Sequence, residues 1–321
     1  MQLGLFTPVF AKLDVKEMIA KVRSFQKITA VELGTGAWPG SDHVDLDGFL
    51  KNKDRARDFR MMIADAGLSI SALSCHGDPL HPDKARAKKE DDLFRRTVQL
   101  AERLEVPVVV TFSGCPGDSE DAKHPNWVTT PWPPEFLEVL DWQWEKKAIP
   151  YWTEAARYAG EHGVKVALEA HPGFIVYNVE SALKLRKAAG DNVGVNFDPS
   201  HFFWQGVDVP AAIRALGPAI FHMHAKDVYL DRQNVAINGV IDTKTYRRMA
   251  ERSWLFRSVG FGHDEFEWKR IASALRLAGY DYVISIEHED ALASIDEGLQ
   301  AAVDVLTRAI LTEQPVEAWW T

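Results

Sequence analysis

Short apolar runs alternate with amphipathic stretches along the whole chain, and this alternation predicts most of its secondary structure. Runs rich in β-branched and aliphatic residues predict strands, and the stretches between them carry apolar residues at helical spacing. The predicted strands cover residues 3–9, 29–35, 69–76, 107–113, 165–171, 193–199, 219–226 and 281–288. Strand and helix that alternate eight times predict an α/β protein with a parallel sheet and right-handed crossovers. Eight units favour closure into a (β/α)₈ TIM barrel over an open sheet.

We expect a single barrel domain over residues 1–321 with a short C-terminal tail. A chain of 321 residues with 46% hydrophobic content is long enough, since such a barrel needs about 250 residues. Two long loops are expected, 114–147 after strand four and about 229–263 after strand seven. Loops of this length usually form lids or interfaces, and both follow strands, so both should lie at the C-terminal face. Four tryptophans in the first loop suit either a cover over a sugar or a dimer interface: Trp127, Trp132, Trp142 and Trp144.

The helix that follows strand three is expected from Asp91 to Leu104. At the other end of the chain, the tail 315–321 contains two adjacent tryptophans, Trp319 and Trp320. This tail could contact a partner chain or pack against the barrel, and the sequence leaves both alternatives open.

Potential metal ligands stand at the ends of four predicted strands: Glu169, Asp198, His224 and Glu287. Because successive side chains of a strand point to opposite faces, each of these strands has an apolar outer face and a small or polar inner face. In the third of them we expect Phe221 and Met223 outside and His222 inside with the ligand. The four ligands should therefore meet at one mouth of the barrel.

Three carboxylates and one imidazole suit a hard or borderline divalent cation such as Mn²⁺, Mg²⁺, Co²⁺ or Zn²⁺. A single glutamate at a strand end is often a loop anchor, but four convergent ligands favour a joint metal site. The only cysteines, Cys75 and Cys115, are too few for a structural zinc site. We expect two buried free thiols, although both fall near strand ends and a disulfide stays open.

Composition limits the partners. The formal charge of −9 disfavours nucleic acid, whose phosphates call for a basic face, although a local basic groove is compatible with an acidic total. The N-terminal sequence has no signal-peptide pattern and no run of about 18 apolar residues occurs, so we expect a cytoplasmic protein without membrane contact. Acidic residues after strand eight, in the stretch 288–292, disfavour a phosphate and favour a neutral or keto sugar.

The sequence resembles the xylose isomerase-like TIM-barrel superfamily in four motifs: Glu169-Ala-His171, Asp198-Pro-Ser-His201, His224-Ala-Lys-Asp227 and Ile286-Glu287. That superfamily includes sugar isomerases, ketose 3-epimerases, inosose dehydratases and apurinic-site endonucleases. The resemblance covers nearly the whole chain and implies one bound divalent metal, Mn²⁺ first among the candidates. It implies that Glu169, Asp198, His224 and Glu287 hold the metal. The two glutamates would also carry the proton, and His201 would contact a substrate oxygen.

Other residues depart from the compact epimerase pattern. His76 stands at the end of strand three, and the long insertion after strand seven contains Arg257 and His263. These features are similar to a branch that includes lyases acting on 3-keto-glycosides, such as C-glycoside-cleaving subunits and a levoglucosan-pathway enzyme. His76 and His263 are candidate acid/base residues, with a structural role as the alternative. The candidate substrate contacts are His201, Lys226, Arg257, Trp38 and His171; for Lys226 beside Asp227 the alternative is an ion pair.

The ligand set predicts a metal-dependent enzyme that removes a proton next to the carbonyl of a keto sugar. Return of the proton gives isomerisation or epimerisation, which is the leading hypothesis. Loss of a β-leaving group from the same intermediate makes the enzyme a 3-keto-glycoside lyase, which we keep as the alternative. An endonuclease is a third, weaker alternative. We expect assembly into an oligomer, either of identical chains or with a partner subunit.

Overall fold

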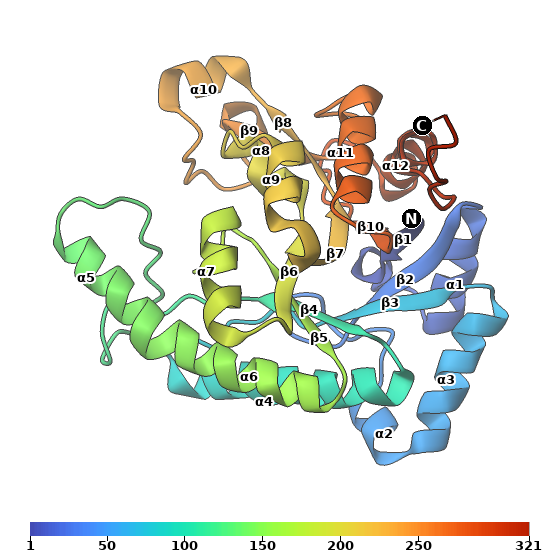
Figure 1. The fold of residues 1–321 in the computed structure, drawn as a ribbon, viewed down its shortest axis with the longest axis horizontal. Coiled ribbons are helices and arrows are strands. Elements are labelled where there is room, and N and C mark those ends of the chain that lie inside the picture. The colour runs from blue at the N-terminus through green and yellow to red at the C-terminus, as the bar shows by residue number, and fades with distance from the viewer. Residues whose placement is uncertain (321) are drawn as a thin grey trace.

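Eight parallel strands form a closed barrel in the computed structural model, which describes residues 1–320 (Figure 1). Their order around the barrel is β1-β10-β7-β6-β5-β4-β3-β2, so each strand lies beside its neighbour in the chain and the last strand closes on the first. The barrel strands are β1 (Gln2–Phe6), β2 (Ile28–Gly34), β3 (Ser69–Ser74), β4 (Val108–Phe112), β5 (Lys165–Glu169), β6 (Val193–Phe197), β7 (Ile220–Ala225) and β10 (Val283–Ile286). The prediction of a (β/α)₈ barrel is confirmed.

Helices follow every barrel strand and cover the outside of the barrel (Figure 1). The α-helices are α1 (Val15–Ser24), α2 (Leu46–Lys51), α3 (Lys53–Asp65), α4 (Lys84–Leu104), α5 (Glu135–Trp142), α6 (Ile149–Glu161), α7 (Val179–Ala189), α8 (Pro199–Trp204), α9 (Val209–Leu216), α10 (Arg232–Asn238), α11 (Glu265–Leu277) and α12 (Ile295–Ala309). Short 3₁₀ turns are η1 (Thr7–Phe10), η3 (Gly217–Ala219) and η4 (Met249–Glu251). Many helices begin at a side-chain cap, and Asp14 and Glu17 form a reciprocal capping box at α1.

The connection after β4 is a loop only as far as α5. From Glu135 to Glu161 the chain is helical throughout, because a π-helical segment, η2 (Gln143–Ala148), joins α5 to α6. The expectation of a loop up to residue 147 was therefore wrong in its last third. Pro150 explains the error: proline breaks the α-helical ladder, but a π turn before it accommodates the missing N–H and the ring. Trp144 consequently packs in the core, whereas Trp132 is 73% exposed.

The insertion after β7 contains a two-stranded antiparallel sheet that sequence patterns did not predict. Strand β8 (Asp227–Leu230) pairs with β9 (Trp254–Arg257), and α10 lies between them in the chain. The indole rings of Trp204 and Trp254 stack in parallel at 4.9 Å, which fastens this sheet to α8. In Figure 1 the sheet and α10 rise above the barrel on the side where β7 ends.

One side chain of the barrel lies on the face opposite to the one expected. The pairing of β6 with β7 shifts between Val195 and Asn196, and this bulge turns Phe221 into the barrel. There Phe221 packs in a small apolar cluster: Ala72, Val108, Val110, Ala167 and Phe221. Its ring occupies the space beside Gly194, where an added Cβ would lie 2.5 Å from the ring. Period-two reasoning failed here because a bulge adds one residue to the strand.

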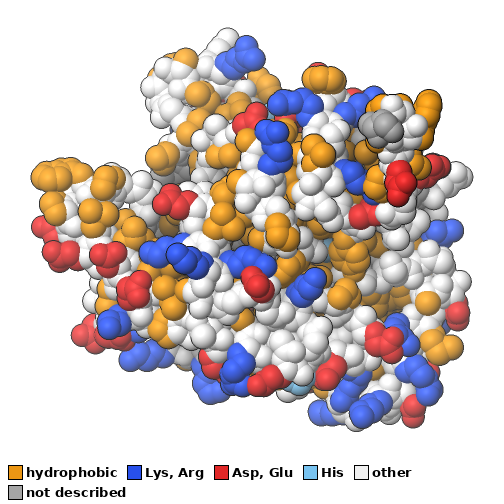
Figure 2. Space-filling view, viewed as in Figure 1, with side chains coloured by type: hydrophobic (Ala, Val, Ile, Leu, Met, Phe, Trp, Pro, Cys, Tyr) orange, Lys and Arg blue, Asp and Glu red, His pale blue; other side chains and the backbone are white. Residues whose placement is uncertain are grey.

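Both cysteines are buried free thiols, as expected. Burial raises the pKa of Cys75 and of Cys115 to about 12. Figure 2 shows cationic and anionic side chains interspersed on the face in view. Within residues 1–320 no helix combines the length and the apolar character needed to cross a membrane. The tail tryptophans Trp319 and Trp320 are 85% and 69% exposed, so they do not pack against the barrel.

Candidate metal centre

The structure brings together the four strand-end ligands at the C-terminal mouth of the barrel. Glu169 ends β5, Asp198 caps α8 directly after β6, His224 lies in β7 and Glu287 follows β10. One potential ligand atom from each of the four lies within 4.8 Å of the others. All four side chains are buried, the most exposed being Glu287 at 5%.

Crowding of carboxylate and imidazole atoms marks this cluster as a place for a cation. Asp198 Oδ2, His224 Nδ1 and Glu287 Oε2 are buried and make no hydrogen bond of good geometry with residues 1–320. Ion pairs alone connect them, since His224 Nδ1 lies 3.0 Å from Glu287 Oε2 and Lys226 reaches both carboxylates. Buried polar atoms without well-formed hydrogen bonds are rare, and they often bind a ligand, water or ion. Oxygen donors with one imidazole nitrogen suit a divalent cation. The donor set therefore fits a metal ion.

Three donors hold the carboxylate of Glu169. His201 Nε2 lies 3.2 Å from Oε1, while His76 Nε2 and Asn196 Nδ2 each lie 3.1 Å from Oε2. Burial alone would raise the pKa of Glu169, but the bonds from His201, His224 and His76 hold it well below the usual value. Glu169 is thus an ionised group in a fixed orientation.

His201 connects two of the ligands, because its Nε2 also lies 3.2 Å from Asp198 Oδ2. Burial would lower the pKa of His201, yet the charge of Asp198 and the bond to it raise this pKa to about 9. The ring of His171 packs 4.0 Å from that of His201. Burial and the positive charge of His201 lower the pKa of His171 to about 3, so His171 stays neutral.

Lys226 places its ammonium group among the carboxylates. Its Nζ lies 2.9 Å from Glu287, 3.0 Å from Asp198 and 3.1 Å from Glu289. Burial would lower the pKa of Lys226, but these carboxylates raise it well above its ordinary value. The neighbouring Asp227 points to the opposite face, as alternation along a strand requires, and the two side chains do not pair with each other.

Glu32 in β2 is a site residue that sequence reasoning missed. It is fully buried and its carboxylate accepts hydrogen bonds from Ser74, from Ser285 (2.7 Å) and from His224 Nε2 (2.9 Å). Burial would raise the pKa of Glu32, but the adjacent His224 and His222 lower it to about 2. Because Nε2 of His224 donates to Glu32, Nδ1 is left to face the ligand cluster. One signal was available: a lone acid within the apolar run Ala30-Val31-Glu32-Leu33.

A cavity of about 420 Å³ opens onto this cluster. Two of the candidate ligands, Glu169 and Glu287, line it, and so do the expected substrate contacts Trp38, His171 and Lys226. Its remaining walls are largely aromatic: Phe112, Phe174, Tyr246 and Phe256. Polar groups at one end and aromatic walls elsewhere are typical of small-molecule sites.

Four of the expected catalytic or substrate-contact residues do not line this cavity: His76, His201, Arg257 and His263. His76 and His201 lie behind it on Glu169, and the other two lie in the insertion after β7. His263 Nδ1 lies 2.8 Å from Asp227 Oδ1, and its ring stacks on Phe203 at 3.5 Å. Arg257 pairs with Asp290 at 3.0 Å. These contacts fasten the insertion after β7 to the barrel, because Asp227 also accepts hydrogen bonds from backbone N–H groups of that insertion. The contacts of His263 and Arg257 thus hold the insertion, and their part in catalysis or substrate binding stays a prediction.

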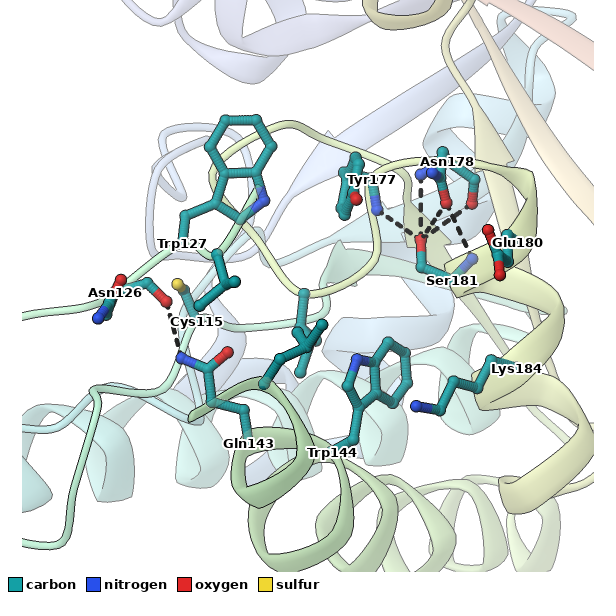
Figure 3. Close-up of a pocket in the computed structure, with 13 residues that line it drawn as sticks. Cys115, Asn126, Trp127, Gln143, Trp144, Tyr177, Asn178, Glu180, Ser181 and Lys184 are labelled. Carbon is teal, nitrogen blue, oxygen red and sulfur yellow. Dashed lines mark hydrogen bonds between the residues drawn. The ribbon is translucent and has the colours of Figure 1, made fainter. Parts of the chain in front are cut away.

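A separate pocket of about 180 Å³ lies between η2, α7 and the loop after β4 (Figure 3). Trp127, Trp144 and Tyr177 line it, and the Lys184 ammonium lies 4.4 Å from the centre of the Trp144 ring. None of the four metal-ligand candidates borders this pocket. Two of the loop tryptophans thus line a pocket apart from the metal centre.

Comparisons with known proteins show the family to which this chain belongs. A family model described as the xylose isomerase-like TIM barrel matches residues 20–309. The chain is 38% identical over 286 residues to YfiH, an uncharacterized protein of Bacillus subtilis (strain 168), covering 88% of this chain and 91% of that one. It is 29% identical over 153 residues to an inosose isomerase of Bacillus velezensis, covering 47% and 49% of the two chains.

Among solved structures, the IolI protein with a bound zinc atom is similar, with a TM-score of 0.63 and 20% identity, covering 97% of this chain and 99% of that one. The family model spans most of the chain, and the relative of 38% identity covers nearly all of it. The chain therefore belongs to the xylose isomerase-like TIM barrel family.

Proposed function

We propose that this protein is a divalent-metal-dependent sugar isomerase or epimerase that removes a proton next to the carbonyl of a keto sugar. The observation that carries the proposal is the buried cluster of Glu169, Asp198, His224 and Glu287, whose potential ligand atoms lie within 4.8 Å of one another. Membership of the family and the half-length similarity to an inosose isomerase support a sugar as substrate. The zinc atom of the similar solved structure supports a metal.

The four clustered side chains would hold the cation, with Mn²⁺, Mg²⁺, Co²⁺ and Zn²⁺ all compatible with the donor set. When bound, a divalent cation supplies Lewis-acid stabilisation of the negative charge that develops on the sugar oxygens. Glu32 positions His224 for this task by accepting its Nε2–H.

The two glutamates are the proposed acid/base pair, and their surroundings differ. Three side-chain donors hold Glu169, whereas ion pairs with Lys226 (2.9 Å) and His224 (3.0 Å) hold Glu287. We assign Glu287 as the group that takes the proton from carbon, and Glu169 faces the same cavity for its return. Return to the other face of the same carbon inverts it, and return to the adjacent carbon isomerises the sugar.

Positive groups would bind the substrate oxygens. The Lys226 ammonium and the protonated His201 both border the carboxylates, so each can donate to a carbonyl or hydroxyl oxygen beside the reacting carbon. Neutral His171 and the aromatic walls would cover the sugar and keep water from the proton in transit.

A lyase that acts on a 3-keto-glycoside is the second candidate. It needs the same proton abstraction, followed by departure of a group at the β carbon. The observation that favours it is a second, larger cavity beside the first, which is large enough to hold a leaving group.

Proton exchange with solvent tests the proposal. We expect the Mg²⁺-loaded protein in D₂O to introduce deuterium at the carbon next to the carbonyl of a ketose or a 3-keto-glucoside, as followed by proton NMR. A new epimer or isomer identifies the first candidate, and release of an aglycone with an enone identifies the second. Glu287→Gln should slow this exchange at least about 10²-fold, since it removes the proposed base. A fully active Glu287→Gln protein would refute the mechanism.

A further inference from the structure

A second cavity adjoins the one at the metal centre and is more than twice its size, at about 960 Å³. Three aromatic residues, Trp38, Phe112 and Phe174, line both cavities and form the wall between them. Phe112 and Phe174 stack at 4.3 Å, so this wall is rigid. A compound bound at the carboxylates could therefore extend past the wall into the second cavity.

His76 links the two cavities chemically. Its Nε2 lies 3.1 Å from Glu169 Oε2 at the reaction centre, and His76 also lines the second cavity. The side chain is only 1% exposed, and its Nδ1 has no hydrogen-bond partner in the described chain. A hydroxyl group both donates and accepts, so a sugar hydroxyl can pair with this nitrogen.

Trp38 is held over the junction of the two cavities by an unusual backbone. Ala37, just before it, has a left-handed φ of 58°, a conformation that non-glycine residues rarely adopt. The Trp38 N–H donates to the carbonyl of His76, and the two rings meet edge to face at 6.0 Å. The indole is 55% exposed, so one face remains free to stack on a ring.

The far rim of the second cavity carries charges of both signs. It is built by the first turns of α4, which begins at Lys84, seven residues before the predicted start at Asp91. Arg86, Lys89 and Glu90 face this cavity, and none of them makes a salt bridge with residues 1–320. Unpaired donors and acceptors of both signs suit the hydroxyl groups of a sugar better than a simple anion.

We infer that the second cavity binds a second hydroxylated ring, so that the substrate is a two-ring glycoside of the keto sugar. Cavities of roughly 300–1,000 Å³ enclose ligands the size of drugs, and the first cavity alone can hold one sugar ring. The inferred ligand places its keto ring against Glu169 and Glu287. Its second ring stacks on Trp38 and places a hydroxyl group beside Nδ1 of His76. This inference rests on the proposed function and specifies its substrate class.

A cavity-filling variant tests the inference by binding alone. Ala85 is exposed in the first turn of α4 and lines the second cavity, so Ala85→Trp fills this cavity and leaves the carboxylate cluster unchanged. Ala211→Trp is the matched control. Both alanines are exposed in a first helical turn and donate their backbone N–H to the capping aspartate, but Ala211 borders none of the cavities described here.

The probes are cellobiose and glucose, and the readout is saturation-transfer NMR with the Mg²⁺-loaded protein, in which the same spectra report any isomerisation of the reducing end. We expect both rings of cellobiose to receive saturation from the unaltered protein and from Ala211→Trp. Ala85→Trp should lose transfer to one ring and raise the Kd for cellobiose about tenfold, while the Kd for glucose changes by less than about twofold.

Transfer to a single ring in the unaltered protein, equal affinity for cellobiose in all three proteins, or no binding of cellobiose would overturn the inference. Failure of the proposed function is distinguishable, because it is measured as absence of deuterium exchange in a one-ring 3-keto-glucose. Exchange with one-ring sugars, together with no contact to a second ring, would leave the proposed function standing and remove the second subsite.

Discussion

Glu32 offers a sharp test of how the centre is held, because it touches a candidate ligand without belonging to the ligand set. Its carboxylate accepts hydrogen bonds from His224, Ser74 and Ser285, and it is fully buried. Glu32→Gln keeps the shape but replaces one acceptor oxygen by an NH₂ group. The carboxamide also loses the negative charge that faces His224, and the NH₂ group must face Ser74 or Ser285, whose hydroxyl then has to turn and accept.

The expected magnitude follows from these contacts. Hydrogen bonds to a charged group contribute about 1.5–3 kcal/mol, and their weakening should appear as a lower thermal midpoint. Loss of the partner that orients a metal-binding histidine typically weakens metal affinity 10–100-fold, or about 1.4–2.7 kcal/mol. Glu32→Gln should therefore weaken metal binding by roughly this factor and slow turnover with it, although Glu32 lines neither cavity.

Calorimetric titration of the metal-free protein with Mn²⁺ or Zn²⁺ measures this affinity. Asp290→Asn is the matched control, because Asp290 is also a buried carboxylate, held by Arg257 and Ser258 away from the ligand cluster. It should lower stability and change metal affinity by less than about twofold. A folded Glu32→Gln protein that binds metal as tightly as the unaltered chain would refute the orienting role.

Two further predictions concern stability. Burial raises the pKa of Asp78 from 3.8 to about 6. Between these pH values the unfolded chain therefore binds fewer protons than the native protein. As pH rises from 4 to 6, ionisation of Asp78 lowers the free energy of unfolding by up to about 3 kcal/mol. Asp78→Asn should remove this loss of stability, so its thermal midpoint should fall less between pH 4 and 6 than that of the unaltered protein. Identical pH profiles of the two proteins would contradict the raised pKa of Asp78. Gly194→Ala should destabilise the barrel by about 1–3 kcal/mol in urea unfolding, since its Cβ would lie 2.4 Å from the carbonyl of Ala219 and 2.5 Å from the Phe221 ring. Gly160 lies in helix α6, where the nearest atom to an added Cβ is 3.6 Å away, so Gly160→Ala should instead raise the free energy of unfolding by up to about 1 kcal/mol. Equal effects at the two positions would exclude the steric explanation.

The barrel and its ligand set were readable from the chain because both depend on local, periodic signals. Parallel strands of one barrel end at the same mouth, so polar residues that end Lys165–Glu169 and Ile220–Ala225 must converge whatever the loops do. The same reasoning identified Lys226 and His201 as neighbours of the ligands, since they share a strand face or the next helical turn with them.

Errors arose where a distant contact overrode a local rule. Pro150 predicts a helix break, but a π turn before it carries the helix through. Phe221 was expected on the outer face of β7, but it points into the barrel because a bulge shifts the register of this strand. His263 was a candidate acid/base residue with a structural role as the alternative, and its Nδ1 lies 2.8 Å from Asp227 Oδ1 in the insertion.

By itself, then, the sequence determined the (β/α)₈ barrel, the mouth at which the chemistry lies and the four convergent ligands, because strand and helix periods repeat locally. Tertiary structure alone decided that Glu32 contacts His224 from 192 residues away in the chain, and that the start of α4 builds a second cavity. It also decided that His76 contacts Glu169 and lines this second cavity. These arrangements join side chains from separate strand–helix units. Closure of the barrel brings such residues within hydrogen-bond distance, and a periodic sequence pattern does not predict which of them meet.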